Sequence, residues 1–224
     1  MPKELSPLKI AIRTASRKLA HVTHARVPMR YPTYSPEVAE RIERYHDDIR
    51  YSTLALAIER ICRENVQGAL SEVGVYQGAT SLFIHKQVPD RKFYLFDTFE
   101  GFPDKYKRDD GRFCDTSQES VKMLLGDSPN LHFRKGFFPS TAVGLEDEMF
   151  ALVMLDVDIY QSAFDVFSFF YPRLVRGAYF FMHDFNSPES DGAIAKAAHE
   201  FMADKLEMII EIPDYSGSAL FRKI

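Results

Sequence analysis

The chain has 224 residues, of which 46% are hydrophobic and 27% charged, and its net charge is −4. These values are typical of a globular protein, and one α/β domain with appended elements accounts for the length. The acidic balance argues against a nucleic-acid-binding surface, and no apolar run approaches the roughly 20 residues of a membrane helix. Cys62 and Cys114 form no metal-binding motif, so we expect both to be reduced in a soluble, cytoplasmic protein.

Residues 1–67 are predicted to form an N-terminal helical cap that precedes the main domain, residues 68–224. A basic amphipathic helix over residues 1–20 is followed by a segment rich in proline and tyrosine, which favours an extended crossing. Two further helices are expected, one ending near Tyr45 and one over residues 49–65. The leading helix can pack on the protein itself or touch an acidic partner or membrane surface, and packing is the simpler interpretation.

Residues 68–81 read as a strand, a tight glycine turn and the start of a helix. The strand reaches Glu72, and Gly74 and Gly78 follow with three residues between them. Glycine can take a positive φ and lets a ligand approach bare backbone, while a helix start offers unpaired N–H groups. A nucleotide-like ligand fits this turn, although the spacing is neither that of dinucleotide-binding folds nor that of a P-loop.

A second acidic residue strengthens that interpretation. Asp97 closes the apolar run that begins at Phe93, 25 residues after Glu72. In doubly wound folds an acid at the end of the second strand hydrogen-bonds the ribose hydroxyls, with a usual separation of about 20 residues. The two acids therefore predict a ribose pocket.

From Gly68 onward, short apolar runs alternate with amphipathic stretches, which is typical of βαβ units. We therefore predict an α/β fold with a doubly wound, mainly parallel seven-stranded sheet, closed by an antiparallel hairpin at the C-terminus. The strands are expected at residues 69–74, 92–97, 131–135, 150–156, 176–182, 206–212 and 218–223. Residues 98–115 form a long connection that contains several aromatic side chains, so a functional lid is expected there, before a helix over residues 116–125.

Two buried strands end in the most informative polar residues. The run from Phe150 to Leu155 leads into Asp156 and Asp158, and the run that ends at Met182 leads into His183 and Asp184. Ligands of open α/β sheets bind outside the carboxyl ends of the strands, so these groups should cluster beside the nucleotide. Clustered carboxylates favour a hard cation such as Mg²⁺ or Mn²⁺, which would acidify a bound hydroxyl. Asp156, Asp158 or His183 would take the proton.

Four segments, in this order and spacing, resemble the TylF/MycF/NovP family of macrocin-type O-methyltransferases. They are Glu72-Val-Gly-Val-Tyr-Gln-Gly, Asp97-Thr-Phe-Glu-Gly-Phe-Pro, Leu155-Asp-Val-Asp-Ile-Tyr-Gln-Ser and His183-Asp-Phe. The resemblance covers residues 68–201 when the helix after Gly192 is included. It implies a class I methyltransferase sheet with a helical cap and a mobile lid. It also implies S-adenosylmethionine (SAM) as methyl donor, Mg²⁺ as cofactor and a hydroxylated small molecule, such as a sugar, as acceptor.

The resemblance also suggests the residues of the site. The predicted cofactor-binding residues are Glu72, Gly74, Tyr76, Gly78, Thr80, Ser81, Asp97, Thr98, Phe99, Gly136, Phe137 and Asp156. The predicted metal ligands are Asp156, His183 and Asp184, and the predicted catalytic residues are Asp156, His183 and Asp158. The family has an acidic pair where this chain has His183-Asp184, and an imidazole weakens a hard-cation site. His183 can instead act as a base without metal, with a pKa near neutrality, or simply hydrogen-bond a loop while Asp184 caps the next segment.

Three functions follow in order of preference. The first is a SAM-dependent O-methyltransferase acting on a small-molecule hydroxyl, with or without the help of a metal ion. The second is a non-catalytic SAM-binding or scaffold protein with the same fold, suggested by the altered acidic pair. The third, a nicotinamide-dependent oxidoreductase, lacks its glycine pattern. The N-terminal helices can also pack against a second copy of the chain, which would make a homodimer.

Overall fold

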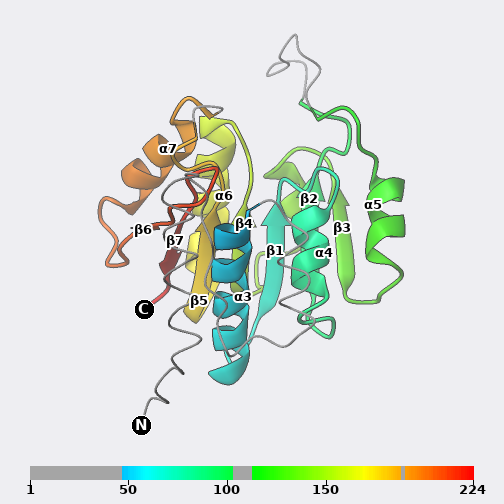
Figure 1. The fold of residues 1–224 in the computed structure, drawn as a ribbon, viewed down its shortest axis with the longest axis horizontal. Coiled ribbons are helices and arrows are strands. Elements are labelled where there is room, and N and C mark those ends of the chain that lie inside the picture. The colour runs from blue at the N-terminus through cyan, green and yellow to red at the C-terminus, as the bar shows by residue number, and fades with distance from the viewer. Residues whose placement is uncertain (1–46, 103–112, 188–189) are drawn as a thin grey trace, which may run out of the picture. The chain divides into compact units, whose positions relative to one another are not determined.

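The structure is a computed structural model that describes residues 47–102, 113–187 and 190–224 (Figure 1). These residues all belong to one compact unit. The predicted leading helix, the segment rich in proline and tyrosine, the first cap helix and the middle of the lid lie outside the described residues. The division into a cap and a main domain at residue 68 therefore stays a prediction.

The described residues form a seven-stranded sheet with the strand order β3-β2-β1-β4-β5-β7-β6. The five strands from β3 to β5 are parallel, and β7 runs antiparallel to both β5 and β6. The strands are β1 (Ala69–Val73), β2 (Phe93–Asp97), β3 (Leu131–Lys135), β4 (Phe150–Leu155), β5 (Leu174–Met182), β6 (Ile210–Glu211) and β7 (Ala219–Arg222). The predicted doubly wound sheet and its closing antiparallel hairpin are confirmed.

Helices cover both faces of the sheet (Figure 1). The helices are α3 (Asp48–Arg63), α4 (Ala79–His85), α5 (Gln118–Leu125), α6 (Tyr160–Phe170) and α7 (Ala193–Met202), with 3₁₀ turns η2 (Ser140–Ala142) and η3 (Tyr171–Arg173). On one face, α3 and α4 lie side by side, and the rings of Tyr51 and Phe83 make an edge-to-face contact. On the other face, α6 and α7 pack against each other and on the sheet.

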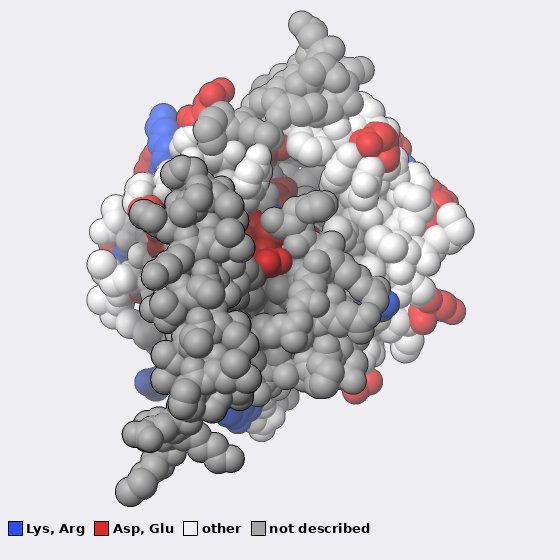
Figure 2. Space-filling model, viewed as in Figure 1, with Lys and Arg blue, Asp and Glu red and all other residues white. Residues whose placement is uncertain are grey.

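The central strands are buried on both faces, as their continuous apolar runs predict. Every residue of β4 is buried, and Phe167 of α6 stacks on Phe180 of β5 with ring centroids 4.9 Å apart. This rigid centre fixes the positions of the strand ends. In the view of Figure 2, acidic side chains are visible near the middle of the face, whereas the visible Lys and Arg side chains lie toward its periphery.

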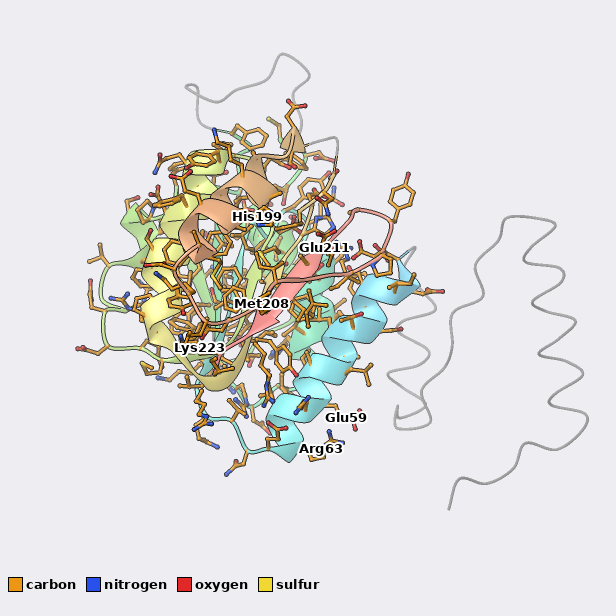
Figure 3. All side chains as sticks on the ribbon, turned by 90° about the vertical axis from the view of Figure 1, so that its left-hand side faces the viewer. Glu59, Arg63, His199, Met208, Glu211 and Lys223 are labelled. Atoms are coloured by element: carbon orange, nitrogen blue, oxygen red, sulfur yellow. The ribbon has the colours of Figure 1, made fainter. Side chains whose placement is uncertain are left out.

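The C-terminal hairpin differs from the prediction in the length of its first strand. We expected residues 206–212 to be a strand, but only Ile210 and Glu211 pair with β7. The side chain of Glu207 is instead buried and accepts hydrogen bonds from Tyr171 (2.5 Å) and Lys223 (2.7 Å). Figure 3 shows Met208 and Lys223 near the β6–β7 edge of the sheet, which faces the viewer. A short edge strand offers few unpaired backbone groups to other chains. Among the described helices, none has the length and apolar character required to cross a membrane.

Candidate active site

A cavity of 610 Å³ opens at the carboxyl ends of β2, β1, β4 and β5. Its size lies within the range of small-molecule sites. Ten of the predicted site residues line it: Gly74, Tyr76, Asp97, Thr98, Gly136, Phe137, Asp156, Asp158, His183 and Asp184. The other five, Glu72, Gly78, Thr80, Ser81 and Phe99, do not line it.

The glycine turn after β1 is shaped by close packing. Gly74 has a φ of +91°, and a Cβ there would lie only 1.8 Å from the carbonyl oxygen of Asp156. Gly78 precedes α4 with a φ of +81°, and a Cβ there would meet Val121 Cγ1 at 2.8 Å. We predicted these glycines for the approach of a ligand. The structure adds that they let β1 and α4 pack against the neighbouring elements.

Glu72 of β1 is buried and does not line the cavity. Its side chain is buried and accepts a hydrogen bond from the Ser81 hydroxyl of α4. Burial raises the pKa of Glu72 well above its ordinary value, and the bond from Ser81 offsets this only in part. Thr80, next to Ser81, makes a 3.0 Å hydrogen bond with the Tyr51 hydroxyl of α3. Both α4 residues therefore tie this helix to β1 and α3.

Asp97 organises the turn at the β2 end of the cavity. Its Oδ2 accepts hydrogen bonds from the backbone N–H groups of Val75 (2.7 Å) and Tyr76 (2.9 Å), and its Oδ1 accepts one from Phe99 (2.6 Å). A carboxylate offers about four lone-pair sites. Three are used here, which leaves one on Oδ1 for a ligand hydroxyl.

The two ends of the predicted lid are fixed beside this turn. At the first end, the Thr98 hydroxyl donates to the Gly101 carbonyl at 2.5 Å. At the other, Asp115 accepts hydrogen bonds from the Tyr76 hydroxyl at 2.7 and 2.9 Å, and Phe113 packs edge-on against the Tyr76 ring. The described parts of the 98–115 connection therefore border the cavity.

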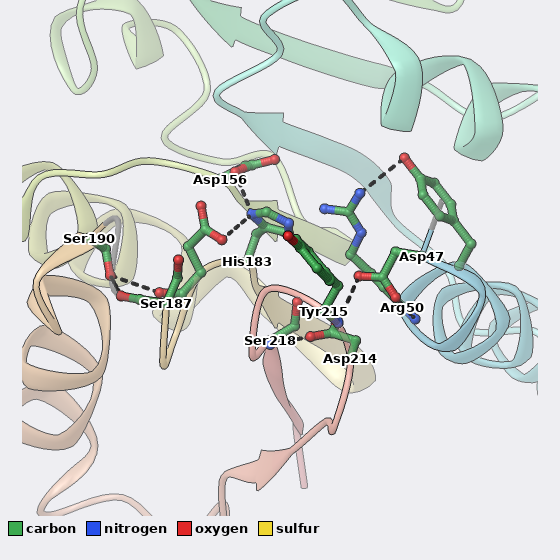
Figure 4. Close-up of polar contacts among 11 residues, drawn as sticks. Asp47, Arg50, Asp156, His183, Ser187, Ser190, Asp214, Tyr215 and Ser218 are labelled. Carbon is green, nitrogen blue, oxygen red and sulfur yellow. Dashed lines mark hydrogen bonds and ion pairs between the residues drawn. The ribbon is translucent and has the colours of Figure 1, made fainter. Parts of the chain in front are cut away.

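His183 lies between two carboxylates at the β4–β5 end of the cavity (Figure 4). Its Nδ1 is 3.1 Å from an oxygen of Asp156 and 3.2 Å from one of Asp184, without a well-aligned hydrogen bond to either. Burial lowers the pKa of His183, but the two acids outweigh burial and raise it to about 10. The expected pKa near neutrality was wrong, because the sequence did not show that both acids face one nitrogen. Burial raises the pKa of Asp156, but His183 outweighs it and lowers that pKa.

The same three side chains have a composition and spacing that suit a divalent cation. Asp156, His183 and Asp184 each offer one ligand atom, and these atoms lie within 4.8 Å of one another. Adjacent ligands of an octahedral ion bound at 2.0–2.1 Å are about 3 Å apart, close to the two nitrogen–oxygen distances seen here. A mixed set of carboxylates and imidazole accepts Mn²⁺ as well as Mg²⁺. To bind a cation, His183 must first lose its proton.

Several lining residues were missed by the sequence interpretation. Tyr215 and Ser216 reach the cavity from the loop between β6 and β7, and Phe102 and Phe113 reach it from the lid ends. Ser162 of α6 also lines it, and its buried hydroxyl has no hydrogen-bond partner among the described residues. The only available signal was the position of Ser162 at the end of the segment that follows Asp156.

Residues 45–222 match the macrocin-O-methyltransferase (TylF) family. The chain belongs to this family. Mycinamicin III 3''-O-methyltransferase of Micromonospora griseorubida is 27% identical over 176 residues, which cover 68% of this chain and 67% of that enzyme. Demethyldecarbamoylnovobiocin O-methyltransferase of Streptomyces niveus is 25% identical over 158 residues, which cover 61% of this chain but only 60% of that enzyme.

Solved structures of methyltransferases share the fold of this family member. The O-methyltransferase NovP superposes with a TM-score of 0.65 at 22% identity, over 79% of this chain and 80% of NovP. The calicheamicin methyltransferase CalS11 gives a TM-score of 0.63 at 18% identity, over 98% of this chain and 94% of CalS11. The predicted class I methyltransferase fold is thereby confirmed.

Proposed function

We propose that this protein is a SAM-dependent O-methyltransferase that methylates a hydroxyl group of a small molecule, such as a sugar or glycoside. One observation carries the proposal: the nucleotide-type turn held by Asp97 and the Asp156–His183–Asp184 cluster line the same cavity. Family membership supports the chemistry, and the named relatives are O-methyltransferases of mycinamicin III and demethyldecarbamoylnovobiocin. The acceptor class is inferred from those relatives.

Asp97 and the backbone around Gly74 would hold the adenosine end of SAM. The free acceptor site on Asp97 Oδ1 can take a ribose hydroxyl, and Gly136 and Phe137 border the same end of the cavity. Glu72, Gly78, Thr80, Ser81 and Phe99 would act indirectly, because they hold the turn and α4 in place without lining the cavity.

The β4–β5 end would hold the acceptor hydroxyl. When bound in the cavity, SAM would supply the methyl group to the acceptor oxygen as its carbon–sulfur bond breaks, and would leave as S-adenosylhomocysteine. A carboxylate oxygen of Asp156 or Asp158 accepts the hydroxyl proton. The positive charge on His183, 3.1 Å from Asp156, stabilises negative charge that develops on the attacking oxygen.

As an alternative to the protonated His183, we propose that Asp156, Asp184 and deprotonated His183 are the ligands of a divalent cation. A bound cation of this kind acidifies a coordinated hydroxyl. Metal titration of the purified protein, followed by calorimetry at several pH values, tests this ligand set. Binding that is unaffected by replacing Asp156 and Asp184 would contradict it.

The second function, a SAM-binding protein without catalysis, is distinguished by two measurements. Calorimetry with S-adenosylhomocysteine tests cofactor binding, and a methyl-transfer assay over a panel of glycosides and phenols tests turnover. Turnover of any acceptor supports the enzyme, and cofactor binding with no turnover across the panel favours the scaffold. Absence of cofactor binding would contradict both the enzyme and the SAM-binding scaffold.

We also propose that the protein forms a homodimer, that it is cytoplasmic and that residues 1–67 form a cap. Exposed apolar side chains at Leu206, Met208 and Ile210 are consistent with a surface that a second copy could cover. Light scattering of the purified chain would reveal the oligomeric state.

A further inference from the structure

Arg50 is a partly buried cation beside the cavity that lacks an anionic partner among the described residues. It lies in the first turn of α3, and its Nη2 donates to the neighbouring Tyr51 hydroxyl at 3.3 Å. Its Nε is buried and has no hydrogen-bond partner in the described part of the chain. Asp47, Asp156 and Asp214 act on the guanidinium through their charge, but none of these described carboxylates forms an ion pair with it. Buried charges in proteins are normally paired, so a missing anion is the simplest explanation.

The surroundings of Arg50 direct it toward the cavity. Figure 4 shows its side chain extending from α3 toward Asp156 and His183, with Tyr215 nearby. Asp47 caps α3 at the backbone N–H of Arg50 and also accepts from the backbone N–H of Tyr215, which lines the cavity. Although burial lowers the pKa of Arg50, nearby Tyr51 and acidic groups including Asp156 raise it, so the side chain stays charged.

The charge of the cavity wall makes Arg50 the natural partner for an anion. The described lining residues include four aspartates, Asp97, Asp156, Asp158 and Asp184, but no Lys or Arg. SAM carries one carboxylate, on its methionine moiety. With ribose at Asp97 and the methyl group near Asp156, the methionine end must extend past Gly74 toward α3 and the start of α4. The chain Arg50–Tyr51–Thr80 lies on that side.

We propose that Arg50 binds the α-carboxylate of the methionine moiety of SAM. This inference rests on the proposed SAM-dependent function and names a cofactor-binding residue outside the nucleotide turn. Tyr51 would position the guanidinium, since its ring lies 4.8 Å from the guanidinium carbon and its hydroxyl is held by Thr80. A guanidinium matches a carboxylate with two parallel hydrogen bonds.

Two ligands separate this contact from a general effect on the site. S-Adenosylhomocysteine has the carboxylate, whereas 5′-methylthioadenosine has the same adenosine thioether without the amino-acid group. Calorimetry should show that Arg50→Ala lowers the affinity for S-adenosylhomocysteine about 10- to 100-fold, because a charge-assisted hydrogen bond is lost. The affinity for 5′-methylthioadenosine should change less than about twofold.

Arg63→Ala is the matched control on the same helix. Arg63 is exposed at the opposite end of α3 and pairs with Glu59 at 3.9 Å (Figure 3), so neither affinity should change. Equal losses for both ligands, or no loss for either, in Arg50→Ala would overturn the proposal. Arg50→Lys keeps the charge and should lose less affinity for S-adenosylhomocysteine than Arg50→Ala. It replaces Arg50→Ala in the test if that variant does not fold. A wild-type protein that binds neither ligand would instead refute SAM binding itself.

Discussion

At the β2 end of the cavity Asp97 accepts hydrogen bonds from three backbone N–H groups, whereas at the β4–β5 end Asp156 and Asp184 face a single imidazole nitrogen. The first carboxylate is fixed by the backbone and stabilises the turn that we propose holds the cofactor. Asp156 and Asp184 instead contact His183, a side chain that can lose its proton and then bind a cation together with them. Binding and chemistry should therefore be separable by substitution.

The largest effect is expected where the two ends meet, at Gly74. In Gly74→Ala the new methyl group would overlap the Asp156 carbonyl, so we expect a loss of more than about 4 kcal/mol of stability or no folded protein. Urea unfolding measures it. Gly144→Ala is the matched control, because Gly144 also has a positive φ, +84°, but no atom of the described residues lies within 4 Å of the place its new methyl group would take. It should lose only about 1 kcal/mol. Similar losses for both would show that the contact with Asp156 is unimportant.

Asp156→Asn should abolish most turnover while sparing the cofactor. Loss of a proton acceptor reduces rates about 10²- to 10⁴-fold. The affinity for S-adenosylhomocysteine should stay within about threefold, because we propose that Asp156 contacts the acceptor and not the cofactor. Steady-state rates with an acceptor from the panel and calorimetry give the two numbers. A parallel fall in both would assign Asp156 to cofactor binding or to the fold.

Asp97→Asn should have the opposite pattern. An amide NH₂ group cannot accept from the backbone donors that the carboxylate serves, so the turn loosens and a ribose contact is lost. We expect S-adenosylhomocysteine affinity to fall about 10- to 100-fold, with turnover at saturating SAM within a few-fold of wild type. If turnover at saturating SAM fell as far as in Asp156→Asn, the proposal that Asp97 serves cofactor binding and Asp156 the chemical step would be contradicted.

His183→Asp should increase the affinity of the β4–β5 end of the cavity for Mg²⁺. The change replaces an imidazole that carries a proton with a third carboxylate, which favours a hard cation. We expect Mg²⁺ affinity to rise about tenfold or more, measured by calorimetry, without a change in S-adenosylhomocysteine affinity. Unchanged Mg²⁺ binding would argue that these side chains do not form the metal site.

Glu207 provides a comparison outside the cavity, and its replacement should leave cofactor affinity unchanged. Burial raises its pKa, but hydrogen bonds from Lys223 and Tyr171 outweigh burial and lower it to about 2. Because the folded-state pKa is depressed, the stabilisation is present above pH 4.5 and is lost as the pH falls toward 2. Glu207→Gln should therefore be less stable than wild type at pH 7, by roughly 1–3 kcal/mol, and the difference should shrink below pH 4.5 in thermal unfolding. A difference independent of pH would contradict this.

The sequence predicted the sheet well because its strands are continuous apolar runs with a polar residue at each end. The same pattern identified Asp97, Asp156, His183 and Asp184 as neighbours at one edge, since parallel strands deliver their carboxyl ends to the same side. It was less accurate for β6, where an apolar stretch at the sheet edge is mostly unpaired. Periodicity does not reveal how much of an edge strand finds a partner.

The position of Arg50 in the sequence is itself unusual. Arg50 lies four residues before Leu54, on the helix face that continues through Ile58 and Ile61, so an apolar stripe begins with a charged residue. The pattern alone cannot say whether such a residue reaches solvent or a site.

The chain's order of apolar runs and strand-end acids determined the fold class, the family and the edge at which the site lies, because these depend on local pattern and connectivity. Tertiary structure decided how each acid is used. It gave Asp97 three backbone donors, buried Glu72 away from the cavity lining, packed Gly74 against Asp156 and brought Asp156 and Asp184 to one nitrogen of His183. Hydrogen-bond partners and pKa values depend on distances between segments far apart in the chain, which no local pattern specifies.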